Sequence, residues 1–262
     1  MVEGEKKITI KNIDYSQHNI IYNIINMHNE GNAFDCDMTY SRGNFYGVFN
    51  ITDIDGNKKN IEIPQPSIKM DVYPQYDDVV KLEPTGNIPL EDNNINSMMV
   101  DLPFVISPPN APSMKEGKKG SNIIANRFAS YYPISDLIYS YMHWMSECYR
   151  VLKEDGVLVW KTQNTITGSR FLPTEELSWL FAEQNGFEVL DKFTLLAKQR
   201  LISGKVKQQQ HARNYSSTFW VFKKSKKKSI RYFDWMTDDA IEKFNKGIRN
   251  NWVNKKRLLT VK

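Results

Sequence analysis

Three short strand-like segments, each followed by an aspartate, constrain the fold of this chain more than any other feature. Residues 33–36 precede Asp37, residues 67–70 precede Asp71, and residues 97–100 precede Asp101. The intervals between these segments suit βαβ units, in which successive strands lie parallel. In an open parallel sheet, ligands bind beyond the carboxyl ends of the strands. We therefore predict an α/β fold in which the ends of neighbouring strands bring Gly43, Asp71 and Asp101 together around one pocket.

The four residues from Asp101 to Phe104 supply the chemical groups of that site. The carboxylate accepts hydrogen bonds, Pro103 fixes the turn and leaves its carbonyl free, and Phe104 offers a flat apolar face. These groups suit a planar amino group attached to an aromatic ring. A buried strand followed by an ordinary turn would look the same in isolation, so the surrounding segments must decide.

The stretch resembles the Asp-Pro-Pro-Tyr/Phe motif of amino-directed, S-adenosylmethionine-dependent DNA methyltransferases, with Leu102 in place of the first proline. Residues 37–45 resemble the Asp-Pro-x-x-Gly-x-Gly-x-Phe loop of the same family, and the matching residues are Asp37, Thr39, Gly43 and Phe45. Met38 stands where the proline is usual, and Ser41 stands where the first glycine is usual. The resemblance implies that this loop binds S-adenosylmethionine. Gly43 would then allow close approach of the backbone to the ligand, and the Cβ of Ser41 would crowd its methionine end.

The resemblance assigns two further cofactor contacts. Asp71 occupies the position that holds the ribose hydroxyls, and a carboxylate at a strand end can accept both hydroxyl protons. A simple turn aspartate is the alternative. Asn87 follows a predicted third strand at 79–82, at the place where this family contacts the adenine ring. Residues 88–96 resemble the family's connection into the fourth strand.

The remaining periodicity completes an α/β pattern. We predict a helix from a cap at Ser16 to about Met27, an inserted β-hairpin at 48–63, and a helix capped by Ser135 and ended by Gly156. A buried strand at 157–161, a helix at 174–185 ended by Gly186, and long strands at 187–197 and 217–223 follow. Residues 149–159 resemble the helix-to-strand joint of class I methyltransferases. The resemblance implies a Rossmann-like, mostly parallel sheet with helices on both faces and a terminal antiparallel hairpin.

Positive charge is concentrated at the carboxyl-terminal end of the chain. The net charge is +5, but residues 223–262 hold 13 Lys/Arg against 4 Asp/Glu, so they carry +9 and the rest carries −4. We predict a catalytic domain at 1–223, containing a substrate loop at 105–132, and a basic helical appendage at 224–262. This distribution favours a polyanionic partner, although a solvated tail that only aids solubility has the same composition.

Two loops beside the predicted site are rich in basic residues. We predict nucleic-acid contacts from Lys115, Lys118 and Lys119 in the first loop, and from Lys198, Arg200, Lys205, Lys207 and Arg213 in the loop at 198–216. The expected partner is nucleic acid, with DNA favoured, and a homodimer or a protein partner is left open. A second motif-like run, Ser107-Pro108-Pro109-Asn110, is displaced from the strand end.

Several classes of protein are disfavoured. No apolar run approaches the roughly 20 residues that span a bilayer, and the first residues do not form a secretory signal. Cys36 and Cys148 lie in apolar contexts, so we expect them to be reduced and buried, which suits the cytoplasm, or the host cytoplasm for a small phage-borne enzyme. No pair of histidines or cysteines has metal-ligand spacing, and we expect no metal.

The sequence thus predicts methyl transfer from S-adenosylmethionine to the exocyclic amino group of a nucleic-acid base. Adenine N6 in DNA is favoured because an acid opens the motif, and cytosine N4 stays open. Two alternatives are a methyltransferase acting on RNA, protein or a small molecule, and a cofactor-fold binding module without catalysis. Ser41 and Leu102 favour the second alternative.

Overall fold

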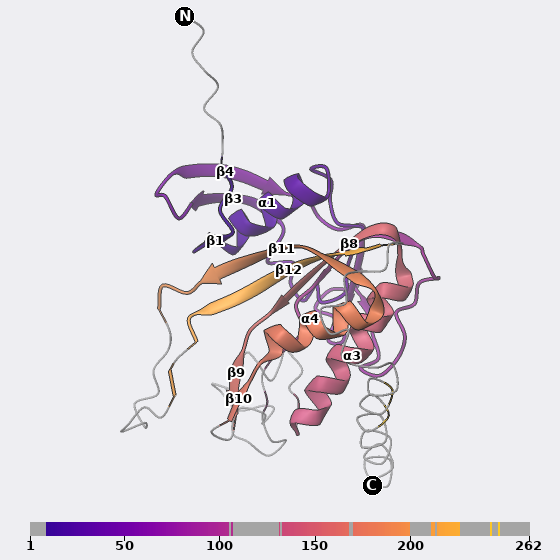
Figure 1. The fold of residues 1–262 in the computed structure, drawn as a ribbon. Coiled ribbons are helices and arrows are strands. Elements are labelled where there is room, and N and C mark those ends of the chain that lie inside the picture. The colour runs from indigo at the N-terminus through magenta and orange to yellow at the C-terminus, as the bar shows by residue number, and fades with distance from the viewer. Residues whose placement is uncertain are drawn as a thin grey trace, which may run out of the picture.

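A computed structural model describes residues 9–104, 106, 131, 133–167, 170–199, 211–212, 214–225, 242 and 246. A twisted eight-stranded sheet runs through the centre of this part of the chain (Figure 1). Its strands, in spatial order, are β1 (Ile13–Asp14), β11 (Phe187–Leu196), β12 (Ser216–Lys224), β8 (Leu152–Thr162), β7 (Ile95–Val100), β2 (Cys36–Asp37), β5 (Ile68–Asp71) and β6 (Val80–Lys81). Within this sheet β12 runs antiparallel to both of its neighbours, while the other described pairs are parallel.

The strand order identifies the fold. From one edge of the sheet, the strands lie in the order β6, β5, β2, β7, β8, β12 and β11. When the strands of this sheet are numbered along the chain from β2, this order is 3-2-1-4-5-7-6, and β1 is added beyond β11. The seventh strand, β12, is the antiparallel one and forms a hairpin with β11. This is the class I methyltransferase arrangement that the sequence predicts, and the order reverses direction beside β2, where such sheets bind ligands.

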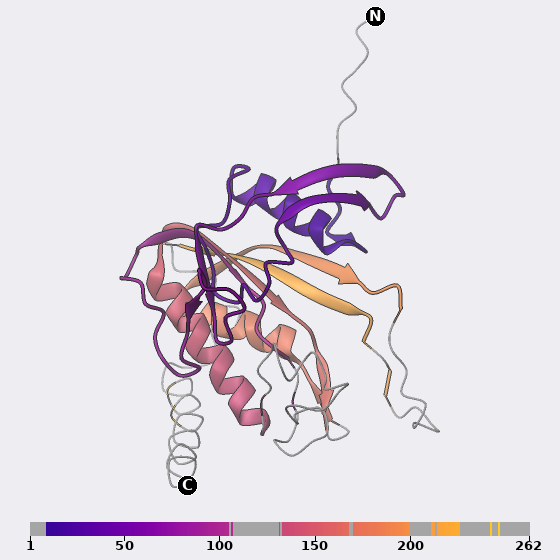
Figure 2. The same cartoon turned by 180° about the vertical axis from the view of Figure 1, so that it is seen from behind.

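Helices cover both faces of the sheet, as predicted (Figures 1 and 2). On one face lie α1 (Gln17–His28) and the hairpin of β3 (Gly47–Thr52) and β4 (Lys58–Ile63). On the other face lie α3 (Ile134–Val151) and α4 (Thr174–Asn185). Along β8, Leu158 and Trp160 join the core under α3 and α4, whereas Val157 and Val159 join the core under α1. Burial on both faces explains why this strand is continuously apolar in the sequence.

Two predicted helix boundaries are confirmed. The Ser16 side chain caps α1 by accepting a hydrogen bond from the Asn19 N–H at 3.2 Å. Gly186 ends α4 with a φ of +100°, and its N–H bonds back to the last turn of the helix.

Two other boundaries are wrong. Pro133, not Ser135, precedes α3, and no side chain caps that end. Gly156 does not end the helix, because α3 passes directly into β8 at Leu152 and Gly156 lies inside that strand. There a Cβ would lie 2.8 Å from the Lys153 carbonyl oxygen, so the glycine permits close packing of backbone. The first strand is also shorter than predicted, since β2 holds only Cys36 and Asp37.

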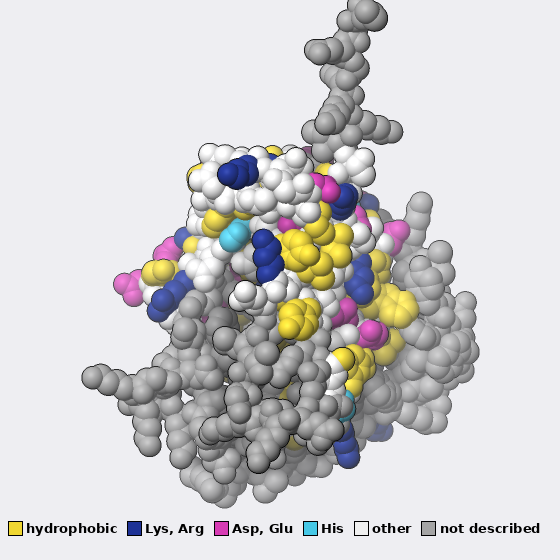
Figure 3. All heavy atoms as spheres, turned by 90° about the vertical axis from the view of Figure 1, so that its left-hand side faces the viewer, with side chains coloured by type: hydrophobic (Ala, Val, Ile, Leu, Met, Phe, Trp, Pro, Cys, Tyr) yellow, Lys and Arg dark blue, Asp and Glu magenta, His cyan; other side chains and the backbone are white. Residues whose placement is uncertain are grey.

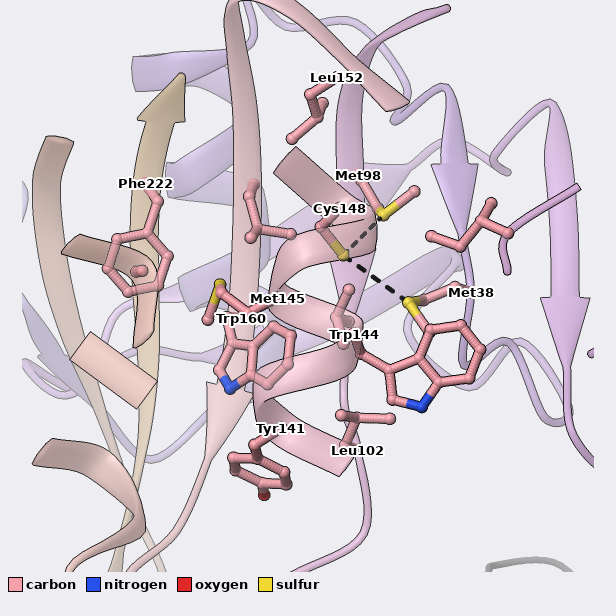
Figure 4. Close-up of a cluster of buried hydrophobic side chains, with 14 of the residues drawn as sticks. Met38, Met98, Leu102, Tyr141, Trp144, Met145, Cys148, Leu152, Trp160 and Phe222 are labelled. Atoms are coloured by element: carbon pink, nitrogen blue, oxygen red, sulfur yellow. Dashed lines mark hydrogen bonds between the residues drawn. The ribbon is translucent and has the colours of Figure 1, made fainter. Parts of the chain in front are cut away.

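The two residues that replace prolines of the family motifs belong to one buried cluster (Figure 4). The Met38 thioether lies 3.8 Å from the Cys148 thiol, and Leu102 is only 4% exposed. The Met38 N–H also donates to the Met99 carbonyl at 3.3 Å, a bond that proline cannot make. Both cysteines are free and buried, as predicted. The replacements therefore fill the core beneath the site.

Candidate active site

The carboxyl ends of β2, β5 and β7 meet at one edge of the sheet. Asp37 is in register with Lys69 of β5 and Met99 of β7, so Asp71 and Asp101 follow within two residues of those positions. The predicted cofactor loop leaves β2 at this point. Main-chain and side-chain hydrogen bonds tie the loop to both neighbouring strand ends.

Toward β5, the loop binds Asp71 through its backbone. The Ser41 N–H donates to Asp71 Oδ2 at 2.8 Å, and the Tyr73 N–H donates to Oδ1 at 2.7 Å. Ser41 has a φ of +50°, a left-handed conformation that glycine adopts at lower cost. Ser41, which replaces the first glycine of the motif, therefore adopts a left-handed backbone conformation that is typical of glycine. Its N–H orients the Asp71 carboxylate.

Toward β7, the loop binds the motif residue Asp101 through Thr39. The Thr39 hydroxyl accepts a hydrogen bond from the Asp101 N–H at 2.7 Å and donates to Asp37 Oδ1 at 3.2 Å. The Asp101 side chain is 22% exposed, so its carboxylate is reachable from outside. Pro103 and Phe104 are half-buried beside it.

Asp37 supports the loop from inside the protein. Its side chain is fully buried, and its Oδ2 accepts a hydrogen bond from the Tyr46 hydroxyl at 2.6 Å. Burial raises the pKa of this carboxyl from 3.8 to about 7, against the opposing effect of hydrogen bonds from Tyr46 and Thr39. Asp37 therefore contributes to the site by fixing the path of the loop.

Gly43 is needed for a reason that the sequence did not reveal. Its φ is +67°, but a Cβ here would lie 2.4 Å from the Tyr40 hydroxyl oxygen. The Tyr40 ring is buried and is held by a hydrogen bond from its hydroxyl to Gln65 Oε1 at 2.7 Å. The Tyr40 ring occupies the space that a side chain at this position would fill, and close approach of a ligand to the Gly43 backbone stays a prediction.

Lys161 is a site residue that the sequence did not single out. Its Nζ lies 2.8 Å from Asp101 Oδ2, and its side chain is 12% exposed. The same ammonium lies 5.1 Å from the ring centroid of Phe45 and 5.7 Å from that of Phe219. The sequence signal that could have identified Lys161 is its place directly after the apolar run 157–160, at the carboxyl end of a predicted strand. Only the pairing of β7 with β8 joins it to Asp101.

Asn87 is exposed, and its segment is tied to α3. His143 Nε2 lies 2.6 Å from the Gly86 carbonyl oxygen, and Glu147 accepts the Ile88 N–H at 2.8 Å. Within the described part of the chain, no hydrogen bond joins Asn87 to the loop or to the three aspartates. Its contact with a cofactor stays a prediction.

Among the predicted nucleic-acid contacts, only Lys198 falls within the described residues, and its ammonium lies 5.3 Å above the ring of Tyr15. Lys115, Lys118, Lys119, Arg200, Lys205, Lys207 and Arg213 lie outside the described residues, as does nearly all of the appendage. Figure 3 shows the side toward which β11 points, where hydrophobic side chains gather beside charged ones. Tyr15 and Tyr215 are exposed aromatic residues at neighbouring strand ends of the main sheet, and Phe171 is exposed in β10 (Arg170–Leu172), which pairs with β9 (Thr165–Thr167) in a separate hairpin.

The described residues contain no cluster of three or more His, Cys, Asp or Glu side chains that could hold a metal ion. None of the described helices is both long and apolar enough to cross a bilayer.

No protein family model matches the chain, and no curated protein matches it. Solved structures do resemble it. One is a proposed DNA modification methylase of Thermus thermophilus in complex with S-adenosyl-L-methionine, at 12% identity and a TM-score of 0.34, covering 52% of this chain. The chain spans 50% of the length of that protein.

Two other similar structures cover more of the chain. A proposed sarcosine dimethylglycine methyltransferase from Galdieria sulphuraria has 11% identity and a TM-score of 0.43, with 81% of this chain and 86% of that chain covered. A proposed methyltransferase of Haloferax volcanii, solved with the Trm112 methyltransferase activator, has 9% identity and a TM-score of 0.39, covering 79% and 94%. The strand order of the sheet identifies the fold.

Proposed function

We propose that this chain, with its class I methyltransferase fold, transfers a methyl group from S-adenosylmethionine to the exocyclic amino group of a nucleic-acid base, with adenine N6 in DNA favoured. The observation that carries the proposal is the hydrogen-bonded convergence of the 38–46 loop, Asp71 and Asp101 at one sheet edge, with the Asp101 carboxylate still partly exposed. A strand-end carboxylate beside a half-buried proline and phenylalanine suits a flat amino-substituted ring.

The residues at this edge fit the proposed cofactor by their chemistry. S-adenosylmethionine supplies an electrophilic methyl group on a positively charged sulfur. Carboxylates and aromatic rings both favour a nearby cation, and Asp71 and Phe45 provide them. In this proposal the loop from Thr39 to Phe45 holds the methionine part, Asp71 and Asn87 hold the nucleoside part, and Asp37 keeps the loop in place.

Asp101 would act on the amine of the substrate. An exocyclic amine is a poor nucleophile because its lone pair is delocalised into the ring. We assign acceptance of its N–H hydrogens to the Asp101 carboxylate and to the carbonyl of Leu102 or Pro103, which turns the lone pair toward the methyl group. S-adenosylmethionine, when bound, would supply the methyl carbon for the new carbon–nitrogen bond, and its sulfur would keep the electron pair of the carbon–sulfur bond. The nitrogen then loses one proton to Asp101, and Phe104 stacks on the base. Positioning of this kind supplies much of the rate.

Nucleic acid as the substrate class has separate support. Tyr15 and Tyr215 are exposed at neighbouring strand ends, and Lys198 lies over the Tyr15 ring. Exposed aromatic rings with nearby cations suit stacked bases and phosphates. The basic loop predicted at 198–216 joins β11 to β12 at this edge and would extend this surface. Binding should then weaken steeply with salt, as counterion release requires.

Asp101→Ala tests the proposal. The variant should bind S-adenosylmethionine as the wild type does in calorimetry, and it should transfer no labelled methyl group. The matched control is Asp155→Asn, which removes another carboxylate paired to a lysine, Lys223, at 2.9 Å, near the start of β8 at the opposite edge of the sheet. Digests of labelled DNA, RNA and protein identify the acceptor. Full turnover by Asp101→Ala would contradict the mechanism, and absence of cofactor binding by the wild type would favour the binding-module alternative.

A further inference from the structure

We propose that Lys161 determines substrate specificity by forming, with Asp101, a donor–acceptor pair that binds an amino group together with the ring nitrogen beside it. The inference rests on the proposed function. It adds a residue outside the motif segments and states which edge of the substrate is recognised.

The position of Lys161 makes this possible. It lies near the carboxyl end of β8, next to β7, and its ammonium touches the carboxylate proposed to hold the reacting amine. Phe45 and Phe219 lie within cation–π distance and leave the charge only 12% exposed. The side chain is therefore held in place, unlike a solvated surface lysine, whose ion pair contributes little.

The ammonium carries three N–H groups, and Asp101 takes one of them. Within the described part of the chain, Asp101 is the single hydrogen-bond acceptor of Nζ, and the other near neighbours are aromatic faces. Donors held beside the proposed acceptor of the amine can bind an acceptor on the substrate itself.

Amino-substituted bases carry such an acceptor. In adenine the amino group is flanked by the ring nitrogens N1 and N7, and in cytosine by N3, all with lone pairs in the plane of the ring. An N–H donated to Asp101 and a ring nitrogen accepting from Lys161 would use both members of the pair at once. A lysine side chain or another aliphatic amine has no ring nitrogen beside its amine. The pair therefore favours a base over a protein amine.

Substrates that lack one ring nitrogen test this assignment. The methylated DNA is remade with 1-deazaadenine or 7-deazaadenine at the target, or with 3-deazacytosine if cytosine is the acceptor. For the wild type, we expect one adenine analogue, or the cytosine analogue, to lower kcat/KM on the order of 10- to 100-fold, as for one lost hydrogen bond to a charged group.

Lys161→Met should methylate that analogue and the natural base with equal kcat/KM, and both values should be lower than that of the wild type on the natural base. It should bind S-adenosylmethionine as the wild type does. Lys192→Met is the control, because Lys192 also pairs with a carboxylate, at 3.3 Å, and lies 4.8 Å from an aromatic ring, that of Trp220. This control should discriminate as the wild type does. Equal discrimination by wild type and Lys161→Met overturns the inference. An equal kcat/KM of the wild type on the natural base and on every deaza analogue also overturns it, and this result does not depend on the folding of the variant. A wild type that binds the cofactor and methylates no base overturns the proposed function itself.

Discussion

Replacing Thr39 with valine tests the link between the cofactor loop and the catalytic motif. Valine keeps the shape of threonine and removes the hydroxyl, which joins the Asp101 N–H at 2.7 Å to Asp37 Oδ1 at 3.2 Å. After the change, the part-buried Asp101 N–H has lost its acceptor and the buried Asp37 has lost one of its donors. Both losses fall on one contact between β2 and β7.

The size of the effect follows from these two bonds. Leaving a buried donor unpaired costs about 1–3 kcal/mol, and a lost bond to a carboxyl adds about 1 kcal/mol. We therefore expect Thr39→Val to lower the free energy of unfolding by about 2–4 kcal/mol. Asp101 would also lose its anchor, and a positioning error at the reacting group can lower turnover about 100-fold.

Urea unfolding followed by circular dichroism measures the stability, and methyl transfer at saturating cofactor measures turnover. Thr39→Ser keeps the hydroxyl and should stay within about 1 kcal/mol of the wild type, because it loses one methyl group. If Thr39→Val unfolds at the wild-type midpoint and turns over at the wild-type rate, the hydroxyl link has no role and the reasoning about the loop is wrong.

Two further predictions concern the same loop. Gly43→Ala should destabilise the protein by at least about 2 kcal/mol, because the backbone is left-handed and the Cβ would overlap the Tyr40 ring. Gly56→Ala is the control, because Gly56 has a φ of +85° and no atom lies within 4 Å of its Cβ position, so only the backbone conformation opposes alanine there. Equal losses of unfolding free energy in the two variants would contradict the clash with Tyr40. The pKa of Asp37, about 7 in the folded protein and near 3.8 when unfolded, means that the folded state holds the proton between these values. Its contribution to stability should therefore fall by about 4 kcal/mol as pH rises from about 4 to about 7. Asp37→Asn should lack this dependence, and parallel stability curves of variant and wild type across that range would contradict the burial argument.

Local patterns were sufficient for most of the architecture. Apolar periodicity, the Ser16 cap and the Gly186 stop predicted α1 and α4, because these depend on residues close in the chain. The end of α3 was predicted wrongly because Leu152 pairs with Ile95 of β7 and starts a strand there, and Gly156 permits close packing against the Asn96 carbonyl oxygen of β7. Where the helix pattern ran directly into a strand pattern, the sequence held no local signal for the junction.

The amino-acid sequence by itself indicated that Asp37, Asp71 and Asp101 each end a strand of one parallel sheet, and strand ends in such a sheet share one edge. The tertiary structure alone decided what each of them touches. Thr39 lies 62 residues from Asp101 along the chain and Lys161 lies 60 residues from it, yet both bind it directly. Register between strands and packing between distant side chains fix such contacts, and neither is written in the local pattern of residues. The same reason explains why the Tyr40 ring leaves no room for a side chain at position 43 and why Met38 and Leu102 pack in one core cluster.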